Sequence, residues 1–209
     1  MPKQTWWNLP ADKRARVIDE AMKEFGARGF SSGSLNVIAD RANVAKGSLF
    51  QYFDDKLDLF VTVCEHVSQE IGRSVLVTMD EDAGLFENLR RLVRQWVTYF
   101  RAHPVERRLA YAAVHELELG VRVAVRAVPN AHYEAAIQPL ISAAKASGEL
   151  RPDVDERMVL SLTTVVLRHL NSAPFEPAGD VGIPFDTLSD AAADRWALAY
   201  VDVLETAFA

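Results

Sequence analysis

The segment from residue 34 to residue 53 constrains the fold more than any other part of this chain. Ile38 and Ala42 lie four residues apart and give its first half one apolar side. Leu49 and Phe53 repeat that spacing in its second half. The segment therefore predicts two short helices that share one apolar face.

Asn43 marks the point at which these two helices would join. Asn is one of the few residues other than Gly that tolerate a positive φ, so it suits a tight turn. Ala39 is small enough for the helices to cross closely. Polar residues after the turn are expected to face outward, namely Lys46, Ser48, Gln51 and Tyr52. This is the layout of a helix-turn-helix, whose second helix enters the DNA major groove.

The composition fits a globular cytoplasmic protein. The chain has 209 residues, of which 49% are hydrophobic, so a core can form. Cys64 is the only cysteine, which excludes an intramolecular disulfide and favours a reducing compartment. We see neither a signal-peptide pattern nor an apolar run of about 18 residues, so we expect no membrane partner.

The negative charge lies outside the helix-turn-helix part. Residues 1–56 contain nine Lys/Arg and seven Asp/Glu, whereas residues 57–209 contain 14 and 22. Salt screens charges beyond about 8 Å, so an acidic remainder does not forbid DNA binding. It should instead weaken non-specific affinity.

Helical periodicity continues along almost the whole chain and predicts an all-α fold. The first helix begins near Asn8 and Pro10 and ends at Gly29, and a long helix covers residues 55–79. Further helices are predicted over about 84–101, 104–117, 118–128, 130–147, 154–171 and 186–207. Residues 172–185 contain three Pro and two Gly and are predicted to form a linker.

The residues on both sides of the motif are similar to one bacterial family. Arg16–Phe30 precede it, Asp54–Phe60 follow it, and the whole span resembles the N-terminal domain of tetracycline-repressor (TetR) family regulators. Beyond about Leu59 only the helical pattern is shared. The resemblance implies a helix-turn-helix DNA-binding domain over residues 1–55, and a helical effector-binding and dimerisation domain over residues 56–209.

The resemblance also implies which residues contact DNA. The expected set is Ser34, Ala45, Lys46, Gly47, Ser48, Gln51, Tyr52 and Lys56. Lys46 would reach a phosphate or a guanine edge, and Gln51 would pair with adenine. Gly47 would allow close approach to the DNA backbone. Lys56, at the start of the long helix, would bind a phosphate.

Three residues depart from the family pattern. Gly33 stands where Thr is usual, Ala45 where Ser is usual and Phe50 where Tyr is usual. Each change removes a hydroxyl, although Ser34 remains as an alternative helix cap. Trp6, with Lys3 and Trp7 beside it, precedes the first helix; packing on its own domain is favoured over an arm in the minor groove.

Neither catalysis nor a metal site is predicted. His115-Glu116 lacks the second His of a zinc motif, and one cysteine cannot build a thiolate site. There is no Gly-rich phosphate loop and no nucleophile elbow. We therefore predict no cofactor and no enzyme activity.

A small-molecule site is expected in the second domain because of the family resemblance. Aromatic walls with a few polar tips are typical of such sites, and the candidates are Trp96, Tyr99, Phe100, Tyr111, His115, Tyr133 and Ile137. The alternative that these residues belong to the core stays open. The set contains few charges, which favours an apolar or weakly acidic effector.

Two apolar stripes in the last helices predict a homodimer with a four-helix interface. Their residues are Val159, Leu162, Val166, Leu170, Leu188, Ala192, Trp196, Ala199 and Val203. Burial within one protomer is the alternative. A dimer would place two recognition helices on the two half-sites of a palindrome.

The sequence thus predicts a ligand-responsive regulator, in particular a repressor that binds a palindromic operator of double-stranded DNA and that a small effector releases. The alternative is a helical ligand- or partner-binding protein that does not read specific DNA. The runs Gly33–Ala39 and Ala45–Phe60 also resemble actinobacterial family members beside alkane-hydroxylase and fatty-acid genes. That resemblance implies a fatty acid or an acyl derivative as effector.

Overall fold

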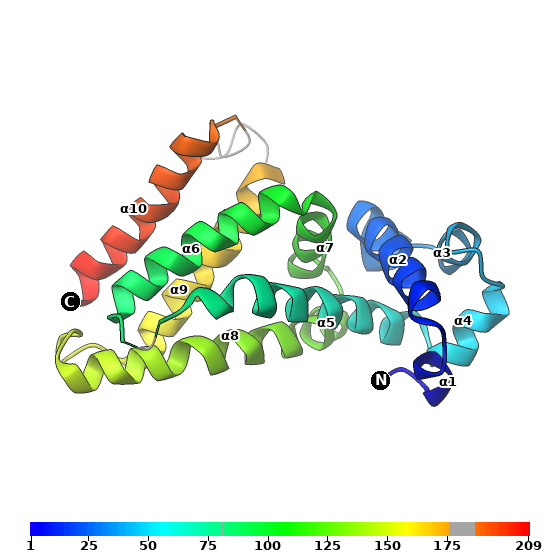
Figure 1. The fold of residues 1–209 in the computed structure, drawn as a ribbon, viewed down its shortest axis with the longest axis horizontal. Coiled ribbons are helices and arrows are strands. Elements are labelled where there is room, and N and C mark those ends of the chain that lie inside the picture. The colour runs from blue at the N-terminus through cyan, green and yellow to red at the C-terminus, as the bar shows by residue number, and fades with distance from the viewer. Residues whose placement is uncertain (81, 176–186) are drawn as a thin grey trace. The chain divides into compact units, whose positions relative to one another are not determined.

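A computed structural model describes residues 1–80, 82–175 and 187–209, and all regular elements within these ranges are helices (Figure 1). The predicted all-α class is confirmed. The α-helices are α1 (Gln4–Trp7), α2 (Ala11–Ser32), α3 (Leu35–Arg41), α4 (Lys46–Tyr52), α5 (Lys56–Ser74), α6 (Leu85–Ala102), α7 (Pro104–Val114), α8 (Leu119–Ser147), α9 (Glu156–Ser172) and α10 (Asp190–Phe208). Short 3-10 turns η1 (Leu76–Thr78) and η2 (Ala173–Phe175) follow α5 and α9.

The helices group into two compact units. Unit 1 contains Met1–Gln69 and His103–Pro129, and unit 2 contains Glu70–Ala102 and Asn130–Ala209. Helices α5 and α8 each contribute residues to both units. These packing units are a different division from the functional domains predicted over 1–55 and 56–209, which stay a prediction.

Unit 1 has an aromatic core built around α2. Phe25 and Phe60 are fully buried with their ring centroids 4.8 Å apart, and the Phe30 ring stacks on Phe60 at 5.5 Å. Helix α7 packs along α2. Their close approach depends on Gly26, because a Cβ there would lie 3.1 Å from the backbone nitrogen of Leu109.

Gly29 breaks α2, although the helix does not end there. Its φ of 69° and ψ of −178° are non-helical, and a further turn continues to Ser32. The sequence predicted that the first helix ends at Gly29, and this predicted end is three residues early, because the helix is only interrupted there. This backbone region is open essentially to Gly alone.

We expect Gly29→Ala to lower the free energy of unfolding by about 1–3 kcal/mol, because Ala must adopt that strained conformation. No atom lies within 4 Å of the position that the new Cβ would take, so the loss would come from the backbone alone. Gly47→Ala is the matched control, since its Cβ also meets no atom within 4 Å and Gly47 is helical. Urea unfolding of both variants measures the difference, and equal stabilities would contradict the strain.

The helices predicted separately over 118–128 and 130–147 are a single helix, α8. Pro129 therefore lies inside a helix and does not begin one. A proline removes one backbone hydrogen bond, and the helix continues through it where packing on both sides compensates. Val121 and Val125 are buried before Pro129, and Ile137 and Ile141 are buried after it.

The other predicted helices agree with the structure to within a few residues at most ends. The long helix predicted over 55–79 ends at Ser74 as an α-helix and continues as η1. Most of the predicted linker over 172–185 lies outside the described residues.

In unit 2, α6 packs against both α9 and α10. Two arginines on α6 attach α10 by ion pairs: Arg90 with Asp202 at 2.9 Å, and Arg101 with Asp194 at 3.2 Å. Glu149 caps the N-terminus of α6, since its carboxylate accepts hydrogen bonds from the first two backbone amides of that helix. Glu149 thus holds the start of α6, and the two arginines hold α6 against α10.

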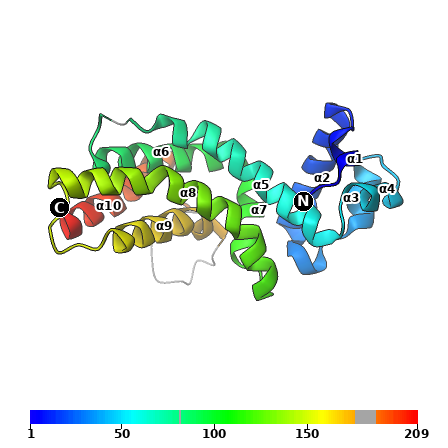
Figure 2. The same ribbon diagram turned by 90° about the horizontal axis from the view of Figure 1, so that it is seen from below.

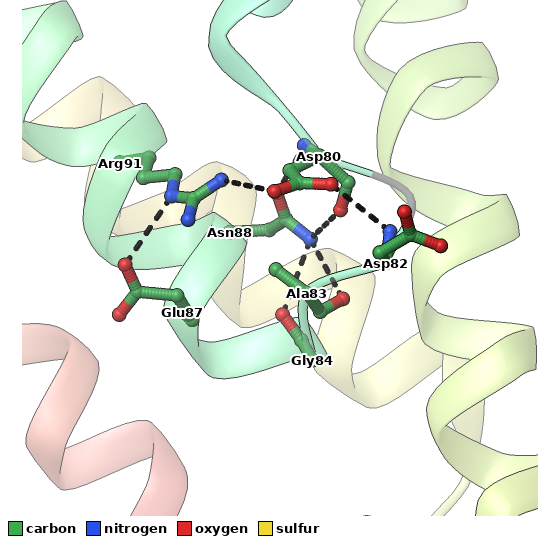
Figure 3. A network of polar contacts seen from close by, with 7 residues as sticks. All are labelled: Asp80, Asp82, Ala83, Gly84, Glu87, Asn88 and Arg91. Carbon is green, nitrogen blue, oxygen red and sulfur yellow. Dashed lines mark hydrogen bonds and ion pairs between the residues drawn. The ribbon is translucent and has the colours of Figure 1, made fainter.

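Asn88 organises the loop before α6 (Figure 3). Its buried amide nitrogen donates to the carbonyls of Asp80, Ala83 and Gly84 at 2.8–3.2 Å, and its oxygen accepts from the Asp80 amide. Arg91 hydrogen-bonds the Asp80 carboxylate at 3.0 Å and lowers its pKa. The stability from that carboxylate is present above its ordinary pKa and is lost as pH falls through the lowered value.

Candidate functional site

Helices α3 and α4 form the predicted helix-turn-helix in unit 1, and Figure 2 shows them as two short helices after α2. Ser34 caps α3, because its hydroxyl accepts a hydrogen bond from the Val37 amide at 3.4 Å. Asn43 has a φ of 54°, which confirms the left-handed turn predicted for it. Helix α4 begins after Ala45 without any side-chain cap.

The apolar side of the motif is buried as predicted. Ile38, Ala39 and Ala42 have no exposed surface, and Leu49 and Phe53 are each 2% exposed. This packing fixes α3 and α4 to each other and leaves the opposite side of α4 in solvent. The solvent-facing residues of that side are Lys46, Gly47, Phe50 and Gln51, with Ser48 partly exposed.

Gly47 is not required by the packing of the protein. Its backbone is helical, and a Cβ there would meet no atom within 4 Å. An exposed helical glycine without a packing role leaves open surface for another molecule. Ala45, beside it, is exposed as well.

Two of the predicted DNA-contacting residues already have partners inside unit 1. Tyr52 is buried, with its ring 6.0 Å from that of Trp6. Lys56 donates to the Ser31 carbonyl at 3.1 Å, and its ammonium lies 4.8 Å from the centroid of the Phe30 ring. The assignments of Tyr52 and Lys56 as DNA contacts stay predictions. To contact DNA, each side chain would have to give up these contacts or make them together with the contact to DNA.

Glu24 supports the start of α3 and was not predicted from the sequence. Its carboxylate is only 2% exposed and accepts a hydrogen bond from the Ser34 amide at 3.0 Å. Arg28 and Arg41 lie 3.5 and 3.7 Å from its oxygens, so its buried charge is compensated. The one sequence signal was Arg28, four residues after Glu24.

Five of the predicted effector residues lie in unit 2. Trp96, Tyr99 and Phe100 are buried on α6, and Ile137 is buried on α8. The Trp96 ring contacts that of Tyr133 edge-on at 5.5 Å between centroids. The structure therefore brings together aromatic residues of α6 and α8 in the interior of unit 2.

Several buried polar atoms in unit 2 lack a hydrogen-bond partner within the described residues. Besides Nε of Arg168, the two that matter here are Nε1 of Trp96 on α6 and Oγ1 of Thr163 on α9. Such atoms are uncommon in folded proteins, because an unmet donor or acceptor costs about 1–3 kcal/mol. A bound molecule with an oxygen atom would satisfy them.

The other two predicted effector residues, Tyr111 and His115, lie in unit 1. Their rings stack on each other with centroids 4.1 Å apart. Unit 1 has an open cavity of about 300 Å³, whose walls include Trp6, Trp7 and His66. None of the predicted effector residues lines this cavity.

A comparison with protein families matches residues 17–63 to the bacterial regulatory proteins of the tetR family. That match covers most of α2, the whole helix-turn-helix and the start of α5. The chain belongs to the TetR family.

Curated TetR-family relatives share moderate sequence identity with this chain. The HTH-type transcriptional regulator AcrR from Shigella flexneri is 38% identical over 61 residues, which are 29% of this chain and 28% of that protein. HbdR from Aromatoleum sp. strain CIB is 30% identical over 151 residues, which are 69% of this chain and 62% of that protein. The chain spans half or less of several such relatives, including 50% of YhgD from Bacillus subtilis.

Solved structures share the TetR fold over nearly the whole chain. A TetR family transcriptional regulator from Chloroflexus aurantiacus has a TM-score of 0.67 and 27% identity, and the match covers 100% of this chain and 98% of that one. FadR from Bacillus subtilis, in complex with stearoyl-CoA, has a TM-score of 0.77 and 15% identity over 92% of this chain and 97% of its own. At that identity the second likeness concerns the fold alone.

The residues that the structure describes contain no cluster of three potential metal ligands among His, Cys, Asp and Glu. Burial raises the pKa of the Cys64 thiol, so the thiol is protonated at neutral pH and is a poor nucleophile. Within the same ranges, no helix has the length and apolar character needed to cross a bilayer.

Proposed function

We propose that this TetR-family DNA-binding regulator acts in the cytoplasm as a homodimeric repressor, binds a palindromic operator and is released by a small apolar or weakly acidic effector. The observation that supports the effector most directly is the pair of unpartnered polar atoms inside unit 2, on Trp96 and Thr163. The exposed polar side of α4 supports the DNA contact. The proposed domains remain residues 1–55 for DNA and 56–209 for effector and dimerisation.

The exposed residues of α4 have suitable chemistry for DNA. Lys46 can donate to a phosphate or to O6 and N7 of guanine, and Gln51 can form two hydrogen bonds with adenine. The open space at Gly47 allows the DNA backbone to approach α4 closely. Ser48 on α4 and Ser34 at the start of α3 are partly exposed and add hydroxyl groups.

A fatty acid or an acyl derivative fits the chemistry of the unit 2 interior. Its chain would lie among apolar side chains, and its carbonyl or carboxylate oxygen would accept hydrogen bonds from Trp96 Nε1 and Thr163 Oγ1. Two structures of the same fold hold such molecules: FadR from Bacillus subtilis with stearoyl-CoA, and AibR with isovaleryl coenzyme A and operator DNA. Coupling between effector and operator is typically about 1–3 kcal/mol, a 5–150-fold change in affinity.

The dimer proposal rests on exposed apolar side chains of α9 and α10. Val159 and Leu170 are buried within the protomer and do not offer a surface. The exposed large apolar residues of these helices are Met158, Leu162, Val165, Trp196 and Val203. The proposed interface therefore keeps Leu162, Trp196 and Val203, with Val166 and Ala199 partly exposed at its edge.

Fluorescence anisotropy tests the proposal. The protein is titrated onto labelled DNA from upstream of its own gene and onto scrambled DNA, at two salt concentrations, with and without oleate or an acyl-CoA. Affinity for one DNA at least about a thousandfold above that for scrambled DNA, lowered by the acyl compound, is expected. Equal and weak binding to every candidate operator would instead favour a helical protein that does not read specific DNA.

Lys46→Ala should weaken operator binding about tenfold and lower the slope of log affinity against log salt by about one, because one cation contact with DNA is lost. Lys46 is exposed and its ammonium makes no hydrogen bond or ion pair with the described residues, so its loss should not destabilise the fold. Lys13→Ala on α2 is the matched control. If Lys46→Ala produced monomers, or left both affinity and slope unchanged, its assignment to the DNA surface would be wrong.

A further inference from the structure

The carbonyl groups of the last three residues of α4 and of the residue that follows it, Phe53, are all bound by residues from the N-terminal segment. Helix ends leave such carbonyls without partners inside the helix. Lys3 Nζ donates to the carbonyls of Phe50 at 2.9 Å and Phe53 at 3.3 Å, and the Lys3 amide donates to that of Tyr52 at 2.8 Å. The Thr5 hydroxyl donates to the Gln51 carbonyl.

Helix α4 has little other local support at its ends. It contains seven residues, and Ala45 provides no side-chain cap at its start. Isolated helices of this length are unstable in water, because few hydrogen bonds offset the cost of nucleation. A cation at the C-terminal end of the helix also interacts favourably with the helix dipole. The contacts from Lys3 and Thr5 therefore matter more here than they would on a long helix.

Trp6 adds an apolar contact to the same end of α4. Its side chain is 3% exposed, and its ring lies 4.9 Å from that of Phe53 and 6.0 Å from that of Tyr52. It belongs to the short helix α1, which packs on α4. The polar and the aromatic contacts thus hold the C-terminal end of α4. They all come from the N-terminal segment, which lies almost 50 residues earlier in the sequence.

We propose that Lys3, Thr5 and Trp6 form an N-terminal clasp that holds the C-terminal turn of α4 and thereby positions its exposed residues for DNA. The residues of the clasp are positioning residues, and they act through α4. Gln51 shows the connection most directly, since its carbonyl is bound by Thr5 while its side chain faces solvent. The effect on DNA binding rests on the proposed function, whereas the effect on α4 does not.

The alternative role for Lys3 is a direct contact with a DNA phosphate. An ammonium group has three donors. In Lys3 they are directed to the carbonyls of Phe50 and Phe53 and to the Asp54 carboxylate, which lies 3.1 Å away. No donor is left for a phosphate while these contacts hold. A positioning role and a phosphate contact therefore predict different salt dependence.

Hydrogen exchange of the DNA-free protein tests the clasp directly. In Lys3→Met and in Thr5→Val, the amides of Leu49–Phe53 should exchange about fivefold faster or more, since each variant removes hydrogen bonds from the end of α4. Amides in the middle of α2 should not change. Lys3→Arg, which keeps a cationic donor, should restore most of the protection, and Lys13→Met should leave it as in the wild type.

Anisotropy titration on operator DNA then separates the two roles. The clasp predicts about a tenfold loss of affinity in Thr5→Val and Lys3→Met, with the salt slope of the wild type retained. A slope lowered by about one in Lys3→Met, with unchanged exchange in α4, would show a phosphate contact and overturn the clasp. Unchanged exchange in both variants would overturn it as well. If the wild type bound no DNA specifically, the proposed function would fail, while exchange in α4 would still decide the clasp.

Discussion

Leu162→Glu combined with Trp196→Glu should convert the protein to monomers and lower operator affinity by about a hundredfold or more. The two side chains are 37% and 47% exposed in the protomer, on α9 and α10. In the proposed dimer each would be covered by the partner, and a carboxylate placed there loses water without gaining a cation. A monomer contacts one half-site only, so it loses about half of the base contacts that give specific affinity.

Light scattering after size exclusion measures the mass, and anisotropy measures the operator affinity. Ala146→Glu, on an exposed part of α8, is the control that adds the same charge outside the proposed interface. Circular dichroism must show that the double variant keeps its helices, as expected for changes at exposed positions. A dimer that survives both substitutions would show that the subunits associate through another surface.

The helix-turn-helix was predictable because its determinants are local. The four-residue apolar spacing, the Ser34 cap and the positive φ at Asn43 all lie within twenty residues and need no knowledge of distant segments. The dimer face was predicted less well for a related reason. Periodicity identifies an apolar stripe, but it does not distinguish Val159, which faces the protomer core, from Leu162, which faces solvent.

Contacts between residues distant in the sequence were missed. Nothing in the local pattern of Lys3 and Thr5 indicates that they cap a helix almost fifty residues later. The packing of α7 on α2 also joins residues that are distant in the sequence. The absence of hydrogen-bond partners for Trp96 Nε1 and Thr163 Oγ1 likewise depends on which distant residues surround them. Burial and hydrogen-bond partners depend on tertiary structure, which a single sequence does not encode in its periodicity.

Gly33 illustrates how structure changes the interpretation of a sequence departure. In the sequence, its replacement of the usual Thr removes a hydroxyl that could cap a helix. In the structure a Cβ at Gly33 would lie 2.7 Å from Cδ1 of Phe25 and 2.8 Å from the Gly29 carbonyl oxygen. The small residue is therefore required by the packing of α2, and Ser34 supplies the cap.

Trp96→Phe combined with Thr163→Val should remove the response to the effector while leaving operator binding intact. Thr163→Val keeps the shape of the side chain and Trp96→Phe keeps an aromatic ring of smaller size, and both delete the polar atom. Hydrogen bonds to a charged group contribute about 1.5–3 kcal/mol, so two such losses predict a fall of at least about a hundredfold in affinity for a fatty acid. The concentration of oleate that releases half of the bound operator measures this change.

Thr163→Val alone distinguishes an effector site from a structural core by its effect on the ligand-free protein, because it leaves no cavity, whereas Trp96→Phe removes buried volume. If Thr163 Oγ1 is unmet because a ligand normally binds it, deleting it should not lower the free energy of unfolding, and it removes a burial cost of about 1–3 kcal/mol. Tyr99→Phe is a useful comparison, since Tyr99 is buried on α6 and its hydroxyl is not among the unmet atoms. A double variant that still releases operator at the same oleate concentration would show that these two atoms do not bind the effector.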